Sequence, residues 1–274
     1  MRAPVLTDTK ALARHRARAA HAPALFLHDL TADEVQDRLA EVNRAFINPA
    51  IVTPFPQVWA GRLPGARVVA DADVLDLAPE AHDLVIHALA LHWANDPVGQ
   101  IIQCARALRP DGLFIGVLLG GQTLHELRAA LAQAEADVSG GLSPRVLPMG
   151  EIRDLGGLLQ RAGFALPVAD SQSQRVSYSD AFHLMRDLRA MGETNALAAR
   201  LRRFTGRAVL GRAATVYAQH FPDADDRIRA TFEMVYLTGW KPHDSQQKPL
   251  RPGSAAARLA DALNAQEGIL PQGD

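Results

Sequence analysis

The chain has 274 residues, a length that suits one large α/β domain or one domain with a small extension. Hydrophobic residues make up 48% of it, so a sizeable core can be buried, while 22% charged residues and a net charge of -1 do not indicate a nucleic-acid-binding protein. No apolar run is as long as a membrane span, and the single cysteine, Cys104, excludes an internal disulfide and makes a reducing compartment the default.

The first twenty residues are basic. They hold five basic residues against one acid, Asp8. A start rich in Arg and poor in acids is typical of a mitochondrial transit peptide, but we favour a solvated basic helix. The preference for Arg over Lys throughout the chain suggests a GC-rich bacterial genome. We therefore expect a bacterial cytoplasmic protein, with the mitochondrial matrix as the alternative.

Residues 31–46 have the apolar spacing of a helix. Thr31 and Glu34 form a capping-box pair that would start this helix. The next apolar stretch contains Pro54 and Pro56, which cannot donate ladder hydrogen bonds, so any strand there should be short or at a sheet edge.

A strand, a helix and a second strand follow each other in the middle of the chain. Residues 83–89 read as a buried strand, and Asp96 can cap a helix whose first turn contains Pro97. Residues 113–119 are apolar on both faces, as expected for an interior parallel strand.

Gly120 and Gly121 end the second of these strands, and Thr123 with Glu126 form another capping-box pair before the next helix. This alternation predicts an α/β fold, a doubly wound and mostly parallel Rossmann-like sheet with helices on both faces. Ligands of such sheets bind beyond the carboxyl ends of the strands. Asp71, His92 and Gly120 should therefore lie on one rim.

The second half of the chain reads as helices and two more strands. A strand is expected near 164–168 and another at 230–240, followed by a polar loop and a closing helix from about Ala255. Residues 179–191 and 195–220 are expected to be helical. We predict an N-terminal helical segment at 1–48 and one domain at 49–274, with a helical insertion at about 179–220.

Several long motifs carry a resemblance to a known family. They are HDLVIHALALHWANDP, RALRPDGLFIGVLLGG, GGQTLHELR, SPRVLPM, DLGGLLQRAGF, LMRDLRAMGETNA and LTGWKPHDSQQKPLRPGSA. The chain resembles class I S-adenosylmethionine-dependent methyltransferases, and within them the bacterial relatives of the mitochondrial complex I assembly factor that hydroxylates an arginine. It is similar, more distantly, to the malonyl-carrier-protein methyltransferases of biotin synthesis.

The resemblance implies S-adenosylmethionine as the cofactor, and the chain keeps only part of the expected cofactor site. Asp71 matches an acid that can accept a hydrogen bond from the adenine amino group; the alternative is a solvated loop acid. The resemblance also implies cofactor contacts for Ala72, and for Ala88, Leu89 and His92 at and just after the end of the strand expected at 83–89.

The start of the domain departs from the family pattern. The family needs a glycine-rich, acidic loop after its first strand, because a Cβ there would collide with the methionine end of the cofactor. Residues 50–56 contain no glycine and no acid. The helix, strand and helix that normally follow, with the acid that binds the ribose, are missing or greatly shortened.

The remaining candidate residues are expected to contact a substrate or a protein partner. They are Trp93, Gly120, Gly121, Trp240, His243, Gln246, Gln247 and Lys248. For Trp93 and His92 the alternatives are core packing and a satisfied surface histidine. For Gly120 and Gly121 the alternatives are an anion-binding turn and a tight strand-to-helix turn, of which the tight turn is favoured.

The sequence gives little support for a general base, a metal site or a nucleophilic residue. Gln122 stands where relatives often carry an acid, so a general base is doubtful there. His243 and Asp244 lack the further ligands that a metal site needs, so no metal is expected. Cys104 is expected to be a small core residue, and no GxSxG nucleophile motif is present.

Two functions remain open from the sequence. The first is a cofactor-dependent protein of the methyltransferase family, with a degenerate cofactor loop, that acts on or binds a protein partner. The second is a non-catalytic assembly factor for respiratory complex I, with a complex I subunit as its partner. A pocket filled by Phe55 or Trp59 would favour the second.

Overall fold

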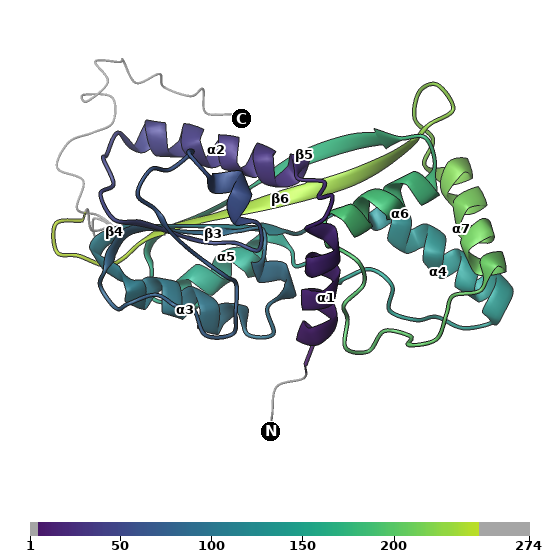
Figure 1. Ribbon diagram of the computed structural model, residues 1–274, viewed down its shortest axis with the longest axis horizontal. Coiled ribbons are helices and arrows are strands. Elements are labelled where there is room, and N and C mark those ends of the chain that lie inside the picture. Colours follow the sequence, from purple (N-terminus) through teal and green to yellow (C-terminus); the bar gives the residue numbers. More distant parts are fainter. Residues whose placement is uncertain (1–4, 247–274) are drawn as a thin grey trace, which may run out of the picture. The chain divides into compact units, whose positions relative to one another are not determined.

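A six-stranded sheet with the order β2-β1-β3-β4-β6-β5 organises the protein, as the computed structural model shows (Figure 1). The structure describes residues 5–246. The strands are β1 (Pro49–Val52), β2 (Arg67–Val69), β3 (His82–Ala88), β4 (Leu108–Leu119), β5 (Ala165–Tyr178) and β6 (Ile228–Trp240). The helices are α1 (Thr9–Ala19), α2 (Phe26–Val42), α3 (Pro97–Ala107), α4 (His125–Ser139), α5 (Ile152–Arg161), α6 (Ala181–Ala190) and α7 (Arg207–His220), with the 3-10 turns η1 (Pro56–Trp59) and η2 (Leu91–Trp93).

The sheet is mostly parallel and has helices on both faces. Strands β2, β1, β3 and β4 run parallel, and β6 lies antiparallel between β4 and β5. Alternate residues of β3 enter two separate hydrophobic cores: Leu84 and Ile86 pack with α2, and Val85 packs with α3. The predicted doubly wound α/β fold is confirmed.

The start of the sheet is shortened, as the sequence predicts. Residues 53–66 contain one 3-10 turn and no α-helix, and β2 pairs directly with β1 through Ala50 and Arg67. The four-residue β1 lies between β2 and β3, so the strand is short but interior. Pro54 and Pro56 follow the strand instead of interrupting it, which removes the reason to expect an edge.

Both predicted capping boxes are wrong. Helix α2 begins at Phe26, so Thr31 lies inside it and donates to the Met234 sulfur over 3.4 Å. Helix α4 begins without a side-chain cap, because the Thr123 hydroxyl donates to the Gly120 carbonyl at 2.8 Å and Glu126 accepts from Thr231 at 2.6 Å. In both cases tertiary partners use the side chains that the local pattern assigns to capping.

One predicted helix start and one predicted helix agree with the structure. The Asp96 carboxylate accepts from the Gly99 N–H at 2.8 Å, and Pro97 is the first residue of α3. The basic N-terminal stretch forms α1, whose first turn is capped by Asp8 through the Ala11 N–H at 3.0 Å. The solvated basic helix preferred from the sequence is therefore present.

The region beyond α5 differs from the prediction in two ways. Strand β5 continues for fourteen residues instead of ending at 168, because its polar middle pairs with β6 along the whole length. The stretch 195–206 is not helical, and only α7 forms within the expected helix at 195–220. The extended β5 and β6 reach towards the ends of α4, α6 and α7 (Figure 1), and Tyr217 of α7 belongs to the same core as Phe232 of β6.

Two uncharged histidines are buried in this fold. The His87 ring nitrogen Nε2 lies 2.9 Å from the Gln100 amide oxygen, and the His28 ring packs edge-on against Phe55. Burial lowers the pKa of each imidazole from 6.5 to about 4. Within residues 5–246, no helix is long and apolar enough to cross a membrane.

We expect the free energy of unfolding to fall as the pH drops from about 6.5 towards 4. In this window the unfolded chain takes up protons that buried His28 and His87 do not, and a depressed native pKa therefore costs stability at lower pH. Urea unfolding followed by circular dichroism at several pH values measures this slope. The double variant His28→Phe/His87→Gln should have a shallower slope, and an unchanged slope would contradict the assignment.

Candidate functional site

Two cavities lie at the carboxyl ends of the parallel strands, where the sheet topology places ligand sites. The first, which we call the α1 cavity, has a volume of about 550 Å³ and lies between α1 and the ends of β1, β2 and β3. The second, which we call the apolar pocket, has a volume of about 260 Å³ and lies between α4, α6, α7 and the loop 145–149. Trp93 of η2 lines both cavities.

The loop after β1 forms one wall of the α1 cavity. The Thr53 N–H donates to the Val69 carbonyl at 3.0 Å, and the Phe55 N–H donates to the Thr53 hydroxyl at 3.2 Å. Pro54 and Pro56 have no N–H group. The four residues of this loop therefore offer no free backbone donor to a ligand.

Phe55 and Trp59 extend from this loop into the core. Only 2% of Phe55 and 3% of Trp59 is exposed. The Phe55 ring centroid lies 4.8 Å from that of His28 on α2, and the ring also approaches Gly192 after α6. Phe55 and Trp59 are thus core residues packed with α2, and neither lines the α1 cavity.

Asp71 follows β2 and is held by a basic residue of α1. Its carboxylate lies 2.5 Å from the Arg16 guanidinium, and both side chains are mostly buried, with 12% and 14% of their surface exposed. Asp71 is therefore an ion-paired residue of the cavity wall, and the sequence alternatives of a free adenine acceptor and a solvated acid both omit this partner. The Arg16 atoms Nε and Nη2 are buried with no hydrogen-bond partner among the described residues.

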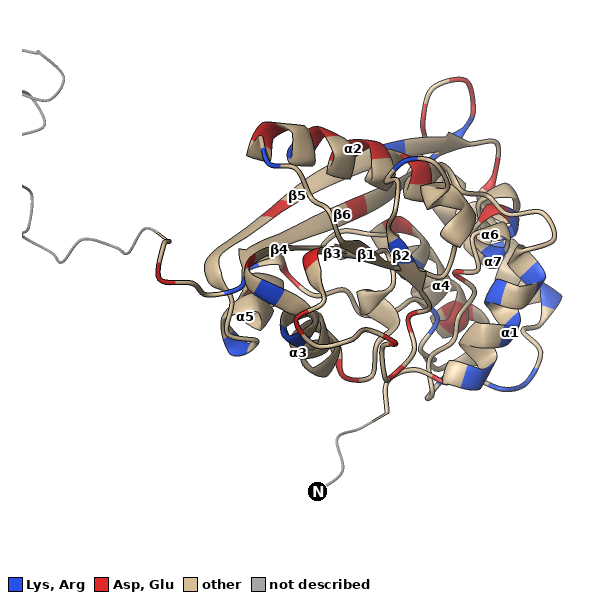
Figure 2. Cartoon of the chain, turned by 60° about the vertical axis from the view of Figure 1, so that its left-hand side comes forward, with Lys and Arg blue, Asp and Glu red and all other residues tan. Residues whose placement is uncertain are grey.

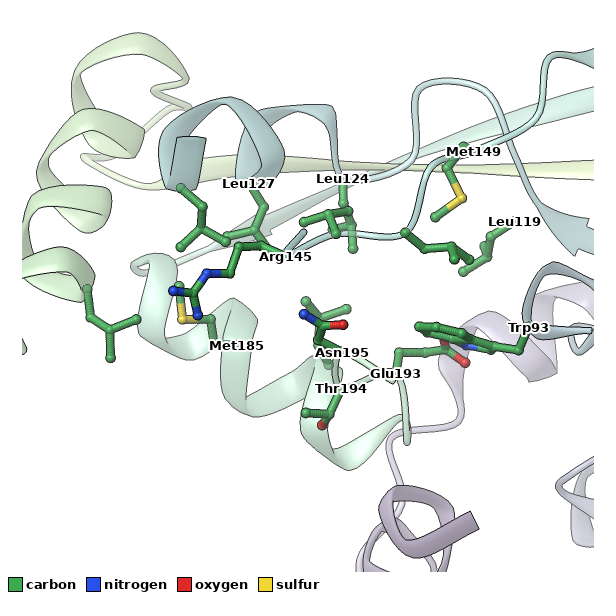
Figure 3. Close-up of a pocket in the computed structure, with 15 residues that line it drawn as sticks. Trp93, Leu119, Leu124, Leu127, Arg145, Met149, Met185, Glu193, Thr194 and Asn195 are labelled. Carbon is green, nitrogen blue, oxygen red and sulfur yellow. The ribbon is translucent and has the colours of Figure 1, made fainter. Parts of the chain in front are cut away.

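The apolar pocket is lined mainly by aliphatic and sulfur-containing side chains (Figure 3). Leu127 and Leu131 come from α4 and Leu124 from the position just before it, and Met149 and Met185 face them from the adjoining loop and from α6. Such a lining suits an apolar side chain or an acyl group, because it removes apolar surface from water without requiring polar partners.

A few polar groups stand at the border of this pocket: Arg145, Glu193, Thr194 and Asn195 (Figure 3). The Arg145 guanidinium is bound to Glu135 and to the Thr205 hydroxyl, the latter at 2.5 Å. Burial opposes ionisation of Glu135, but its bonds to Arg145 and Ser143 outweigh this effect and lower the carboxyl pKa. This ion pair keeps the charged groups at the pocket wall.

Glu193 ties the loop after α6 to the end of β3. Its carboxylate accepts from the Trp93 indole N–H at 2.6 Å and lies 3.3 Å from the His92 Nε2 atom. Burial of Glu193 opposes ionisation, but nearby His92 and Arg16 and the two hydrogen bonds lower the pKa of this carboxyl group. Sequence reasoning did not identify Glu193, although it lies inside the motif LMRDLRAMGETNA.

The predicted cofactor contacts are only partly brought together. Asp71 and Ala72 line the α1 cavity, and the Ala72 carbonyl accepts from the Gln100 amide at 3.2 Å. Ala88, Leu89 and His92 are buried and line neither cavity. At this end of β3 the residues that line the α1 cavity are Ala90 and Trp93.

Gly120 and Gly121 form a tight strand-to-helix turn. The Gly120 N–H donates to the Glu233 carbonyl, the Gly121 N–H to the Gly150 carbonyl, and the Gln122 N–H to the Glu233 carboxylate, all at 2.9 Å. Gly121 has a φ of +49°, and a Cβ there would collide with Glu233. The donors that could hold an anion are therefore used inside the protein.

Trp240 is separated from the cavities by the length of the sheet. It is the last residue of β6 and pairs with Leu113 of β4. Because β6 runs antiparallel to β4, it ends on the side of the sheet away from the carboxyl ends of the parallel strands, where the cavities lie. In the separate short unit that begins at His243, the His243 ring bonds to the Ser245 hydroxyl at 2.7 Å and the Gln246 amide oxygen accepts from the His243 N–H. Gln247, Lys248 and the expected closing helix lie outside the described residues.

Two further expectations concern reactive groups. Cys104 lies on the buried face of α3, and burial raises the pKa of its thiol, as expected for a packing residue. Among residues 5–246 no group of three or more His, Cys, Asp or Glu side chains is arranged to hold a metal ion. The groups available for function at this site are therefore Glu193 and the other residues that line the α1 cavity and the apolar pocket.

Comparison with known proteins identifies related sequences. Residues 40–116 match a methyltransferase domain family. The chain is 40% identical over 220 residues to the mitochondrial arginine hydroxylase NDUFAF5 of Danio rerio, which covers 80% of this chain and 68% of that protein. Identity to the human NDUFAF5 is 38% over 211 residues, with 77% of this chain and 61% of the human protein covered, so the chain spans less than two thirds of the human relative.

This chain is also similar to a more distant relative and to a solved structure. The malonyl-[acyl-carrier protein] O-methyltransferase of Laribacter hongkongensis is 38% identical over 188 residues, which cover 69% of this chain and 61% of that enzyme. The structure of a candidate methyltransferase from Bacillus halodurans aligns with a TM-score of 0.47 and 16% identity, over 76% of this chain and 99% of that protein.

We expect Glu193→Ala to destabilise the protein by about 1–3 kcal/mol, because it leaves the buried Trp93 N–H without an acceptor. Glu193→Gln keeps an acceptor and should cost less. Urea unfolding at pH 7.5 measures both, with exposed Glu151→Gln as the control. Equal stability of Glu193→Ala and the wild type would show that the carboxylate does not hold this wall.

Proposed function

Because the chain belongs to the family of the arginine hydroxylase NDUFAF5, within the class I S-adenosylmethionine-dependent methyltransferases, we propose that it acts by binding a partner polypeptide without S-adenosylmethionine-dependent chemistry. The partner segment enters the apolar pocket. The observation that carries this proposal is the loop after β1, whose Thr53 and Phe55 N–H groups are both used internally.

The fit of the cofactor fails at its methionine end. The family's loop presents backbone to the cofactor without a Cβ in the way, whereas here two prolines lack donors and the Thr53 and Phe55 N–H groups are used internally. The strand that would carry the ribose-binding acid has no counterpart between β1 and β2. We infer that the cofactor loop is degenerate.

The residue expected to bind adenine does not make up for the missing contacts to the methionine end and the ribose of the cofactor. A carboxylate that accepts from an adenine amino group needs an oxygen free for it, and Asp71 is held by Arg16 at 2.5 Å. Opening that pair would leave a mostly buried guanidinium without its counter-ion, which is costly. The ion pair thus favours the closed arrangement of α1 over cofactor binding.

The apolar pocket supports the binding role. It is separate from the altered loop, and its lining by α4, α6 and Met149 does not depend on a cofactor. We infer that the bound segment belongs to a protein, and that this protein is a subunit of complex I, as the family resemblance implies. The preference for Arg over Lys supports a bacterial cytoplasmic protein, and the mitochondrial relatives support the alternative, the mitochondrial matrix.

A second function is supported by one observation. The α1 cavity, at about 550 Å³, is large enough for a nucleoside-sized ligand and retains Asp71 and Ala72 in its wall. A chain that binds S-adenosylmethionine there through another geometry would be an enzyme of the methyltransferase family acting on a protein partner. The two functions are separated by direct measurement of cofactor binding.

We expect no heat of binding and no thermal shift when the purified protein is titrated with S-adenosylmethionine or S-adenosylhomocysteine at millimolar concentration. The malonyl-[acyl-carrier protein] O-methyltransferase of Laribacter hongkongensis, tested in the same way, is the positive control. Micromolar binding would overturn the proposal in favour of the enzyme. In that case Asp71→Ala should weaken binding if Asp71 contacts the cofactor.

A further inference from the structure

Charge is strongly segregated in this nearly neutral chain. Helix α1 carries four basic residues and no acid, and the stretch 197–221 carries five arginines and no acid. Helix α2, by contrast, carries five acids and one arginine. Figure 2 shows basic residues gathered on α1 and α7 and acidic residues along α2. Such separation produces a local field although the net charge is only -1.

The exposed basic side chains of the two segments form what we call the basic face. Its members are Lys10, Arg14, Arg18, Arg202, Arg203 and Arg207. Asp8 joins the segments, since its carboxylate lies 2.9 Å from Arg200 and 3.5 Å from Arg202. Among residues 5–246, Arg202 is the only member with an ion-pair partner. The other five charges are available to a partner.

Apolar side chains are exposed beside these charges. Phe204 lies between Arg203 and Arg207 and is fully exposed, and Leu142 is 72% exposed. Both line a surface cavity of about 440 Å³, and Arg145 lines the same cavity. Arg145 lines the apolar pocket as well. The exposed apolar patch and the apolar pocket therefore meet at one side chain.

We propose that the basic face and the apolar pocket together bind an acidic segment of a partner protein, which inserts one apolar side chain into the pocket. The inference rests on the proposed role in partner binding and names the chemistry of the partner. Acidic residues would meet Arg203 and Arg207, while the inserted side chain would contact Leu127 and Met185. Charge complementarity of this kind accelerates association and selects among partners.

An acidic membrane surface also attracts basic residues beside an exposed aromatic ring. A polypeptide fits the observations better, because a bilayer surface cannot fill a pocket of about 260 Å³ bordered by Glu193 and Asn195. A side chain on a polypeptide can enter that pocket, and the adjoining backbone can bond to its polar border.

The test is fluorescence anisotropy with a panel of labelled peptides rich in Asp and Glu, each with a central Leu, Met or Phe. We expect binding that weakens as salt is raised and that is lost when the central residue is Ser. Arg203→Glu/Arg207→Glu should weaken binding about tenfold or more, and Phe204→Ser should weaken it as well. Arg153→Glu/Arg161→Glu on α5 makes the same charge change at exposed positions and should leave binding unchanged.

Other outcomes overturn the inference. These are failure of every acidic peptide to bind, equal affinity for the Arg203→Glu/Arg207→Glu variant, or binding only to phosphatidylserine vesicles or RNA. All substituted positions are exposed, and circular dichroism checks that each variant folds. Cofactor titration is a separate experiment, so binding of S-adenosylmethionine would overturn the non-catalytic role without affecting the peptide result, and absence of peptide binding would leave the cofactor result intact.

Discussion

The carboxylate of Glu193 is the contact on which the arrangement of the site depends. It joins the loop after α6 to Trp93 and His92 at the end of β3, and Trp93 stands between the two cavities. A buried carboxylate is stable only when donors surround it, so this wall is held in one position. The loop cannot move away from the sheet without leaving the indole N–H unpaired.

The departure from the methyltransferase pattern is confined to one side of that wall. On the side of β1 the donors are used, Phe55 is buried, and Arg16 covers Asp71. On the other side the pocket between α4 and α6 is open. The α1 cavity and the apolar pocket thus depend on different elements, so one can change without altering the other.

The sequence predicted the parts of the fold that follow from local pattern. The apolar runs of β3 and β4, the Asp96 cap and the shortened start could all be read from residue order. Side chains with distant partners could not: Thr31 bonds to Met234 and Glu126 to Thr231, so neither caps a helix. Glu193 and Arg16 were missed for the same reason, since their partners lie far away in sequence.

The shortened start also leaves the sheet with two unequal borders. At one border β2 has three residues, which is too short to recruit a strand from another molecule. At the other border β5 has fourteen residues, and its middle carries the sequence DSQSQR, from Asp170 to Arg175. Polar and charged side chains on a long border strand oppose the sheet-to-sheet stacking that leads to amyloid. The polar middle of β5 therefore disfavours stacking of a second sheet along the longer border.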